Sequence, residues 1–233
     1  MPILAAMQSA AIRLMGQRPS VFFGASGKFE AEISDLVNEV ARDVAASADW
    51  QALTVIGVLT GDGSTTEFDL PADYDRMLVS AEVQDTTAWF WGYRAMTDLN
   101  QFLYEGSIGF QPLPGGWIIY GGKMRFVPAP PSDQNATFPY ISRNYARDAG
   151  TLATKAAFTS DTDEFLLPDR LLTLGLVWRW RENKKLDFTG DQEAFTKAIS
   201  EYASKDKGTR IYRRTGYARI PGTYPAWPWP LGA

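Results

Sequence analysis

The spacing of apolar residues changes twice along this chain, and this restricts the fold more than any other feature of the sequence. Four segments carry apolar side chains at every third or fourth position, which is the spacing of an amphipathic helix. They are residues 2–15, 28–48, 168–187 and 190–206. From Trp50 to Tyr145, short β-prone runs alternate with turn residues instead. This order predicts an α+β fold in which a helical bundle carries an inserted β domain.

The β-prone region contains two hairpin signals, Gly61-Asp62-Gly63 and Gly121-Gly122. Glycine-rich turns of this kind connect antiparallel strands. The runs expected to pair across them are 53–59 with 65–70, and 117–120 with 123–127. The other expected elements are strands at 77–83 and 138–145 and a short helix at 96–104. Several short strands with tight turns are typical of a small antiparallel sandwich or barrel.

These elements predict three parts of the chain. Residues 1–49 and 150–208 form the helical bundle, 50–149 form the inserted β domain, and 209–233 form an extended C-terminal docking tail. Charge is distributed unevenly between them. Residues 1–150 carry 10 Lys and Arg against 17 Asp and Glu, whereas residues 151–233 carry 13 against 10. An acidic body with a basic end indicates two surfaces that have different partners.

Cysteine and histidine are both absent from the 233 residues. Without cysteine there are no disulfides, thiolate metal sites or cysteine nucleophiles. Without histidine there are no Ser-His-Asp triads and no HExxH zinc sites. Acid clusters at 73–75 and 161–164 leave open a small hydrolase that uses only Asp and Glu. Solvated turns and a helix N-terminus are the simpler interpretation, so neither a metal nor another cofactor is expected.

Targeting signals are not expected from the sequence. No apolar run reaches the roughly 18 residues that a membrane helix needs. The N-terminal segment has no basic region before its apolar residues, and Arg13 interrupts it early. This pattern does not match a secretory signal peptide. The expected place of synthesis is therefore the cytoplasm of the producing cell.

The last 26 residues, 208–233, have neither a helical nor a clean strand period. They contain no acid, and their arginines, aromatic residues and prolines alternate closely. Proline keeps a chain extended, and arginine and aromatic side chains dominate the energetics of interfaces. The side chains expected to bind a partner are Arg210, Tyr212, Arg213, Arg214, Tyr217, Arg219, Tyr224, Trp227 and Trp229. Two alternatives remain open, a tail that wraps its own subunit and a tail that binds DNA phosphates.

Residues 163–188, DEFLLPDRLLTLGLVWRWRENKKLDF, resemble a stretch found in bacteriophage head-to-tail adaptor proteins, also called head-tail connector or tail tubular proteins. The shared pattern is an acidic turn, Leu-Pro-Asp, an apolar helix through Trp-Arg-Trp, and a Lys-Leu-Asp-Phe step. The order of parts is also similar to that family. The resemblance implies a structural virion protein without catalytic activity. Such adaptors assemble as a homo-oligomeric ring, typically of twelve copies, at the neck between head and tail.

The resemblance also implies partners and sites. The ring would bind the phage portal protein on one side and tail or nozzle proteins on the other, and DNA would pass through its lumen without specific binding. The tail residues would bind the portal or a neighbouring subunit. An acidic helix face is the candidate for the lumen wall, because close carboxylates repel phosphates. Its residues are Glu32, Asp35, Glu39 and Asp43, and an ordinary solvated face is the alternative.

A second class of function stays open beside the adaptor. Exposed tryptophans can form a platform on which a sugar ring stacks, as in a receptor-binding or carbohydrate-binding virion module. The candidates for such a platform are Trp89, Trp91 and Trp117. Trp178 lies on the apolar stripe of its predicted helix, which favours a place in the core.

Overall fold

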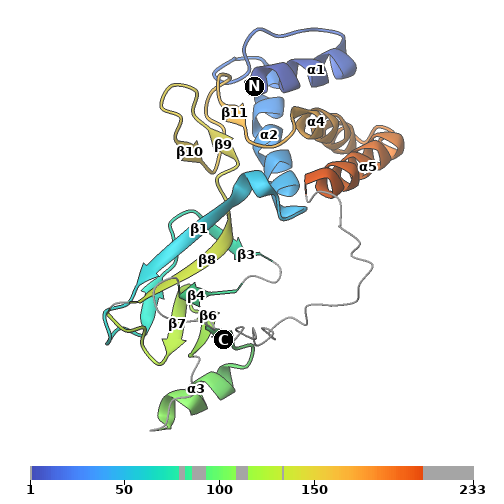
Figure 1. Cartoon of the computed structure of the whole chain (residues 1–233). Helices are drawn as coiled ribbons and strands as arrows, with labels where there is room; N and C mark the ends of the chain where they lie inside the picture. Colours follow the sequence, from blue (N-terminus) through green and yellow to red (C-terminus); the bar gives the residue numbers. More distant parts are fainter. Residues whose placement is uncertain (1, 79–81, 86–92, 109–114, 133, 207–233) are drawn as a thin grey trace, which may run out of the picture. The chain divides into compact units, whose positions relative to one another are not determined.

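The computed structural model describes residues 2–78, 82–85, 93–108, 115–132 and 134–206. Within these residues the chain forms five α-helices, a short 3-10 helix and strands that group into three small sheets (Figure 1). They fall into two units. Unit 1 contains residues 2–55, 72–78 and 140–206, and unit 2 contains the described residues of 56–71 and 82–139. The α+β class expected from the sequence is confirmed.

Unit 1 contains four helices, and α4 packs against the other three. The helices are α1 (Ile3–Met15), α2 (Lys28–Ala46), α4 (Asp169–Asn183) and α5 (Thr189–Asp206). The apolar stripe of α2 is buried as its spacing predicts, and Ile33, Val37 and Val44 are fully inaccessible. Residues 169–183 are buried on several sides of the helix, because α4 lies between neighbours. The expected packing of residues 28–48 against residues 168–187 is confirmed by the contact between α2 and α4.

The observed starts of α2 and α5 agree with the expected ranges 28–48 and 190–206 to within one residue. The residue that precedes α2 is Gly27, and no side chain caps that end. At α5, Thr189 is the first helical residue, and its N–H donates to the Asp187 carboxylate (3.2 Å). An acid two residues earlier therefore satisfies this amide at the start of α5.

The rest of unit 1 contains short strands. Strands β9 (Ala146–Arg147), β10 (Thr154–Lys155) and β11 (Glu164–Phe165) form an antiparallel sheet in the order β10-β9-β11. Strand β3 (Tyr74–Met77) pairs with the end of β8 (Asn135–Ser142). A 3-10 turn, η1 (Gln51–Leu53), follows α2. The small β9 sheet was not expected from the sequence, because strands of two residues carry no detectable period.

Unit 2 contains the hairpin expected at Gly121-Gly122. Strands β6 (Gly116–Tyr120) and β7 (Lys123–Val127) pair antiparallel across it, and both glycines have positive φ (63° and 76°). Two positive φ values are required by a type I′ turn, which explains the two glycines. The full sheet has the order β2-β7-β6-β5, with β2 at Glu67–Asp69 and β5 at Arg94–Ala95. Helix α3 (Leu99–Ser107) contacts β6 and β7, close to its predicted place.

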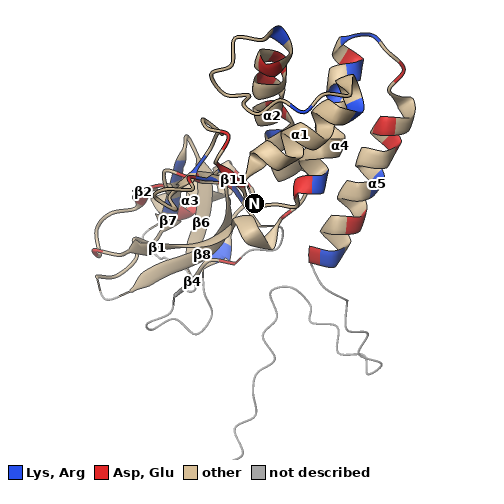
Figure 2. Ribbon diagram, turned by 90° about the horizontal axis from the view of Figure 1, so that it is seen from above, with Lys and Arg blue, Asp and Glu red and all other residues tan. Residues whose placement is uncertain are grey.

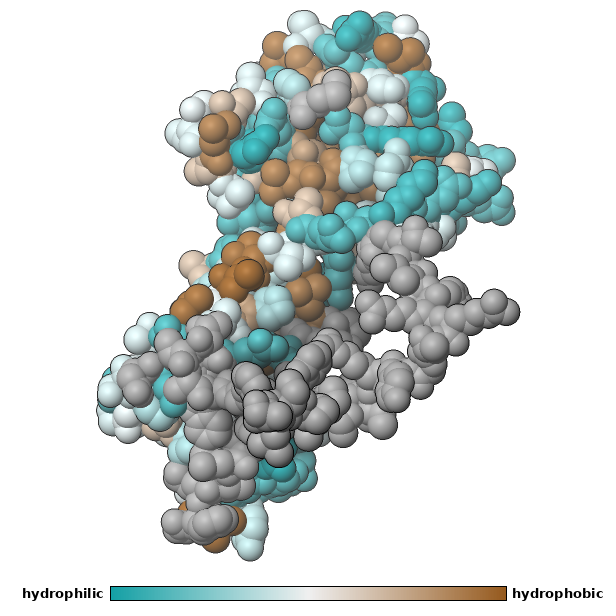
Figure 3. All heavy atoms as spheres, in the orientation of Figure 1, coloured by the Kyte–Doolittle hydropathy of each residue, from teal (hydrophilic) through white to brown (hydrophobic). Residues whose placement is uncertain are grey.

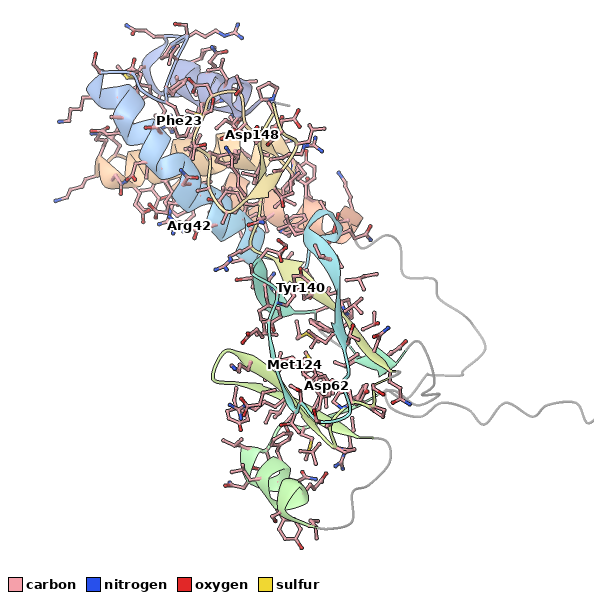
Figure 4. All side chains as sticks on the ribbon, turned by 90° about the vertical axis from the view of Figure 1, so that its left-hand side faces the viewer. Phe23, Arg42, Asp62, Met124, Tyr140 and Asp148 are labelled. Carbon is pink, nitrogen blue, oxygen red and sulfur yellow. The ribbon has the colours of Figure 1, made fainter. Side chains whose placement is uncertain are left out.

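The prediction of a hairpin at Gly61-Asp62-Gly63 is wrong. Strand β1 (Thr54–Thr60) pairs with β8, whereas β2 pairs with β7 in a different sheet. The turn is held by a distant segment, because the Gly61 N–H donates to the Gln134 carbonyl and the Gly63 N–H to the Pro130 carbonyl (both 2.9 Å). Asp62, labelled in Figure 4, also accepts hydrogen bonds from the amides of Ser64 and Thr65. These bonds redirect the chain from one sheet to the other.

The third sheet has the order β1-β8-β3, and β4 (Gln84–Asp85) also pairs with β8. Of the strand expected at 77–83, only Met77 belongs to β3, and residues 79–81 lie outside the described part of the chain. The described strands form three separate sheets and no closed barrel. The predicted barrel is therefore not found, and the arrangement as a bundle plus sandwich stays a prediction.

Candidate interaction surfaces

Three of the four acidic side chains expected on a lumen wall are ion-paired with α4 or with Lys184, which directly follows it. Glu39 and Asp43 lie beside Arg179, and Glu32 lies beside Lys184. Figure 2 marks the acidic residues of α2 and the basic residues of α4 by colour. The fourth residue, Asp35, is exposed and forms no ion pair with any residue that the structure describes. The negative charge of this face is thus largely offset by basic side chains of the same subunit.

Arg179 is the centre of this charge network. Its guanidinium donates to the Asp43 carboxylate (2.8 Å) and to the Glu182 carboxylate (3.0 Å), and it lies over the ring of Trp178 (4.3 Å to the centroid). Burial acts to lower the pKa of Arg179, but its hydrogen bonds to the two carboxylates outweigh that effect and raise the pKa. Arg179 therefore stays charged and joins the exposed faces of α2 and α4.

Glu32 forms the second connection between α2 and α4. Its carboxylate accepts hydrogen bonds from Lys184 Nζ (2.8 Å) and from the indole N–H of Trp180 (3.2 Å). The hydrogen bond from Lys184 is the main reason that the pKa of Glu32 is lowered, and burial opposes it only in part. The ring of Trp180 also packs edge-on against Phe29 at the start of α2 (5.9 Å between centroids).

Replacing Lys184 with alanine should raise the pKa of Glu32 toward its ordinary value of 4.5. In the wild-type protein the lowered pKa stabilises the fold fully above the pKa of the unfolded chain. That contribution is lost as the pH falls through the lower pKa of the folded protein. NMR titration of the Glu32 carboxyl carbon in both proteins measures the shift. An unchanged Glu32 pKa in Lys184→Ala would contradict the assigned cause.

The acid cluster at 161–164 connects neighbouring loops through hydrogen bonds. Asp163 is fully buried, and its carboxylate accepts hydrogen bonds from the Thr159 and Ser160 amides and from Lys155. The Asp161 carboxylate accepts hydrogen bonds from two amides of the loop before α2. Solvated turns were therefore the wrong expectation for Asp163. The described residues contain no group of three or more side chains placed to hold a metal ion.

The acid cluster at 73–75 is also used in packing. The Tyr140 hydroxyl donates to Asp73 (2.7 Å), and Tyr140 is almost fully buried. Burial is the main reason that the pKa of Tyr140 rises to about 12, and the hydrogen bond to Asp73 adds to it. Asp75 pairs with Arg76 at the surface (2.6 Å). Both carboxylates therefore form contacts within unit 1.

A hollow of about 320 Å³ in unit 1 is a surface that the sequence did not indicate. Its wall includes Arg42 from the end of α2 (Figure 4), together with Arg76 and Arg143. Arg76 is bound to Asp49 and Asp75. The lining residues come from four separate stretches of the chain, so no local motif could have revealed the hollow.

The predictions made for the individual tryptophans have different outcomes. Trp178 is buried against Phe195 and Phe188, which confirms its predicted place in the core. Trp117 is buried as well, so it cannot belong to an exposed platform for sugars. Trp89 and Trp91 lie outside the described residues, and so do the tail residues from Arg210 to Trp229 that were expected to bind a partner.

The acidic side chains that stood out in the sequence join helices and loops in the structure. The class of protein comes from a comparison with protein families, in which the model of the SU10 adaptor protein family matches residues 2–220. The chain belongs to this family of phage head-to-tail adaptors, and the resemblance noted from residues 163–188 is confirmed. No curated protein matches the chain. Among the described helices, none is long and apolar enough to span a membrane.

Proposed function

We propose that the chain assembles as a ring, typically of twelve copies, that joins the phage portal protein to tail or nozzle proteins. The observation that carries this proposal is the family match, which extends over nearly the whole chain, residues 2–220. The adaptor would occupy the neck of the virion after its synthesis in the bacterial cytoplasm. Residues 1–49 and 150–208 would form the ring-building bundle, and residues 50–149 would form a β domain carried on it.

The proposed docking element is the tail, residues 209–233. Helix α5 ends at Asp206, whose carboxylate accepts a hydrogen bond from the Gln51 N–H (2.7 Å). This bond ties the end of α5 to the segment that follows α2. Beyond it, four arginines can pair with carboxylates, while Trp227 and Trp229 can fill apolar pockets between prolines. The absence of acid from 208–233 suits an acidic partner surface.

Deletion of residues 209–233 should abolish binding to DNA-filled heads that carry the portal, while the body keeps its thermal stability. The reason is that α5 ends at Asp206 and the buried side chains of the described helices pack against one another. Pull-down of purified heads measures binding, and calorimetry measures stability. Unchanged binding would contradict the docking role, and a chain that fails to fold would favour a tail that wraps its own subunit.

Two tail variants separate the contribution of the arginine charges from that of the aromatic side chains. Replacing Arg210, Arg213, Arg214 and Arg219 with glutamine removes the charges and keeps the aromatic residues. Replacing Tyr224, Trp227 and Trp229 with alanine does the reverse. A salt-dependent loss confined to the arginine variant, together with binding of free DNA by the wild-type tail, would favour the DNA-binding alternative.

We also propose that the acidic face of α2 lines the lumen. Arg179 and Lys184 offset the charge of Glu32, Glu39 and Asp43, so the wall would present alternating charges rather than a strong negative field. DNA would pass such a wall without a specific binding site. An image of the assembled neck that places these side chains on the outer rim of the ring would contradict this assignment.

A further inference from the structure

Strand β1 is an edge strand with an unusually apolar sequence. It lies at the end of the order β1-β8-β3, so the described strands pair with only one side of it. Its seven residues read Thr-Val-Ile-Gly-Val-Leu-Thr and include neither a charge nor a proline. Exposed edges normally carry lysine, proline or a bulge, because unpaired backbone groups otherwise recruit another strand. The absence of lysine and proline from β1 indicates that this edge is covered when the protein is in use.

The two faces of β1 are different. Gly57 lies against the ring of Phe138 on β8, so closely that a Cβ atom at this position would come within 2.7 Å of it. The residues next to Gly57 therefore point to the other face, since side chains alternate along a strand. They are Ile56 and Val58, which are 67% and 56% exposed. Figure 3 shows apolar surface along this strand. Two neighbouring β-branched side chains thus lie in solvent on one face of an open edge.

The sequence of β1 is nearly palindromic about Gly57. In an antiparallel pair of two such strands centred on Gly57, Ile56 lies opposite Val58 of the partner subunit. The same register places Thr54 opposite the partner's Thr60 and Val55 opposite the partner's Leu59. Opposite pairs of threonines are favourable, the other opposite pairs are all apolar, and no charges meet. The strand is therefore complementary to itself.

We propose that β1 pairs antiparallel with β1 of a second copy of this chain around a two-fold axis at Gly57. The pairing continues each β1-β8-β3 sheet across the interface, and it buries a four-residue cluster made of Ile56 and Val58 from both copies. Such a contact uses the same surface on both subunits and closes at two copies. The pair is thus a dimer of the unassembled protein, and a ring uses other surfaces. This inference does not depend on the proposed function.

The absence of cysteine from the chain allows a cross-linking test of the register. Full-length Ile56→Cys and Val58→Cys proteins are mixed and oxidised. In the proposed register the mixed pair is directly opposite, with Cβ atoms roughly 4.5–5.5 Å apart, whereas the two matched pairs are diagonal at roughly 7–8 Å. The mixed disulfide should form several-fold faster than either homodimer. Equal rates for all three products would overturn the register and the proposal.

A second measurement is sedimentation velocity over the micromolar range. The wild-type protein should approach twice the 25.9 kDa of the chain, and an Ile56→Lys/Val58→Lys variant should stay monomeric because lysine on an edge prevents pairing. The matched control is Leu152→Lys, which changes a side chain that is 65% exposed in unit 1 and should leave the dimer intact. Circular dichroism checks that each variant is folded.

Three outcomes would overturn the proposal. One is a wild-type protein that stays monomeric at every concentration. Another is a dimer that the Ile56→Lys/Val58→Lys variant does not weaken. The third is a monomeric wild-type protein that dimerises once residues 209–233 are deleted, which would assign the edge of β1 to the chain's own tail.

Discussion

Replacing Asp163 with alanine is expected to lower the free energy of unfolding of unit 1 by about 3–5 kcal/mol, because it breaks a buried ion pair from one side. Asp163 is completely buried, and its carboxylate holds the Lys155 ammonium (2.8 Å) and the amides of Thr159 and Ser160 (2.7 and 2.9 Å). Alanine removes the acceptor that these three donors share, and Lys155 keeps its contacts with Thr159 and Asp148. The backbone carbonyl of Asp163 also accepts the N–H of Ile3 (2.8 Å), so the start of α1 should loosen as well.

Native-state hydrogen exchange of the α1 and α4 amides measures this loss within unit 1, independently of unit 2. Two variants serve as controls. Asp163→Asn keeps one acceptor oxygen but not the charge, so it should lie between alanine and the wild type. Asp75→Ala breaks an exposed ion pair with Arg76 and should cost less than about 1 kcal/mol. If Asp163→Ala costs no more than Asp75→Ala, the loop around 155–163 does not anchor α1.

The helices of unit 1 could be predicted from the sequence because their signal is local. Residues such as Ile33, Val37 and Val44 recur at the spacing of one helix face, and the structure buries that face. The packing of α2 against α4 could be predicted because each of the two helices has an apolar stripe that needs a partner. The class of protein followed from the stretch 163–188, and the family match confirms it.

The strand pairing could not be predicted in the same way, because it depends on contacts between distant segments. Gly61-Asp62-Gly63 has the composition of a hairpin turn, but the carbonyls of Pro130 and Gln134 hold it in another arrangement. No property of residues 53–70 indicates that partner. The hairpin at Gly121-Gly122 was predicted correctly because its two strands are adjacent in sequence and need nothing else.

The surfaces were the hardest part to predict. An acidic face on α2 is visible in the sequence, but its neutralisation by Arg179 and Lys184 requires knowing that α4 lies beside it. Asp163 looked like a solvated acid because its partners, Lys155 and the amides of the same loop, form no recognised motif. Charge patterns along a sequence therefore overestimate the net charge that a folded surface presents.

Gly175 is the second residue at which a small change should have a large effect. It lies inside α4, where glycine costs about 1 kcal/mol relative to alanine, so its presence requires another explanation. A Cβ atom at this position would come within 2.3 Å of a methyl group of Val40 on α2 and 3.1 Å of the Phe195 ring on α5. Gly175 therefore allows α4 to approach both neighbouring helices.

Gly175→Leu should destabilise unit 1 by about 3 kcal/mol or more, because overpacking of a dense core forces side chains and helices apart. Gly175→Ala should lose less, since the gain in helix propensity offsets part of the clash. The same exchange measurement on α4 reports both losses. The exposed Gly190, whose Cβ would meet nothing within 4 Å, supplies the control, and Gly190→Ala should not destabilise unit 1.

A double-mutant cycle tests whether the clash with Val40 is the cause. Val40→Ala alone removes buried methyl groups and should cost about 1–3 kcal/mol. When it is combined with Gly175→Ala, the new methyl group occupies space that the Val40 methyl has vacated. The loss of stability in the double mutant should therefore be smaller than the sum of the two single losses, by an interaction energy of roughly 0.5–3 kcal/mol. Strict additivity would mean that α2 and α4 separate freely at this point, and that the glycine is not there to bring them together.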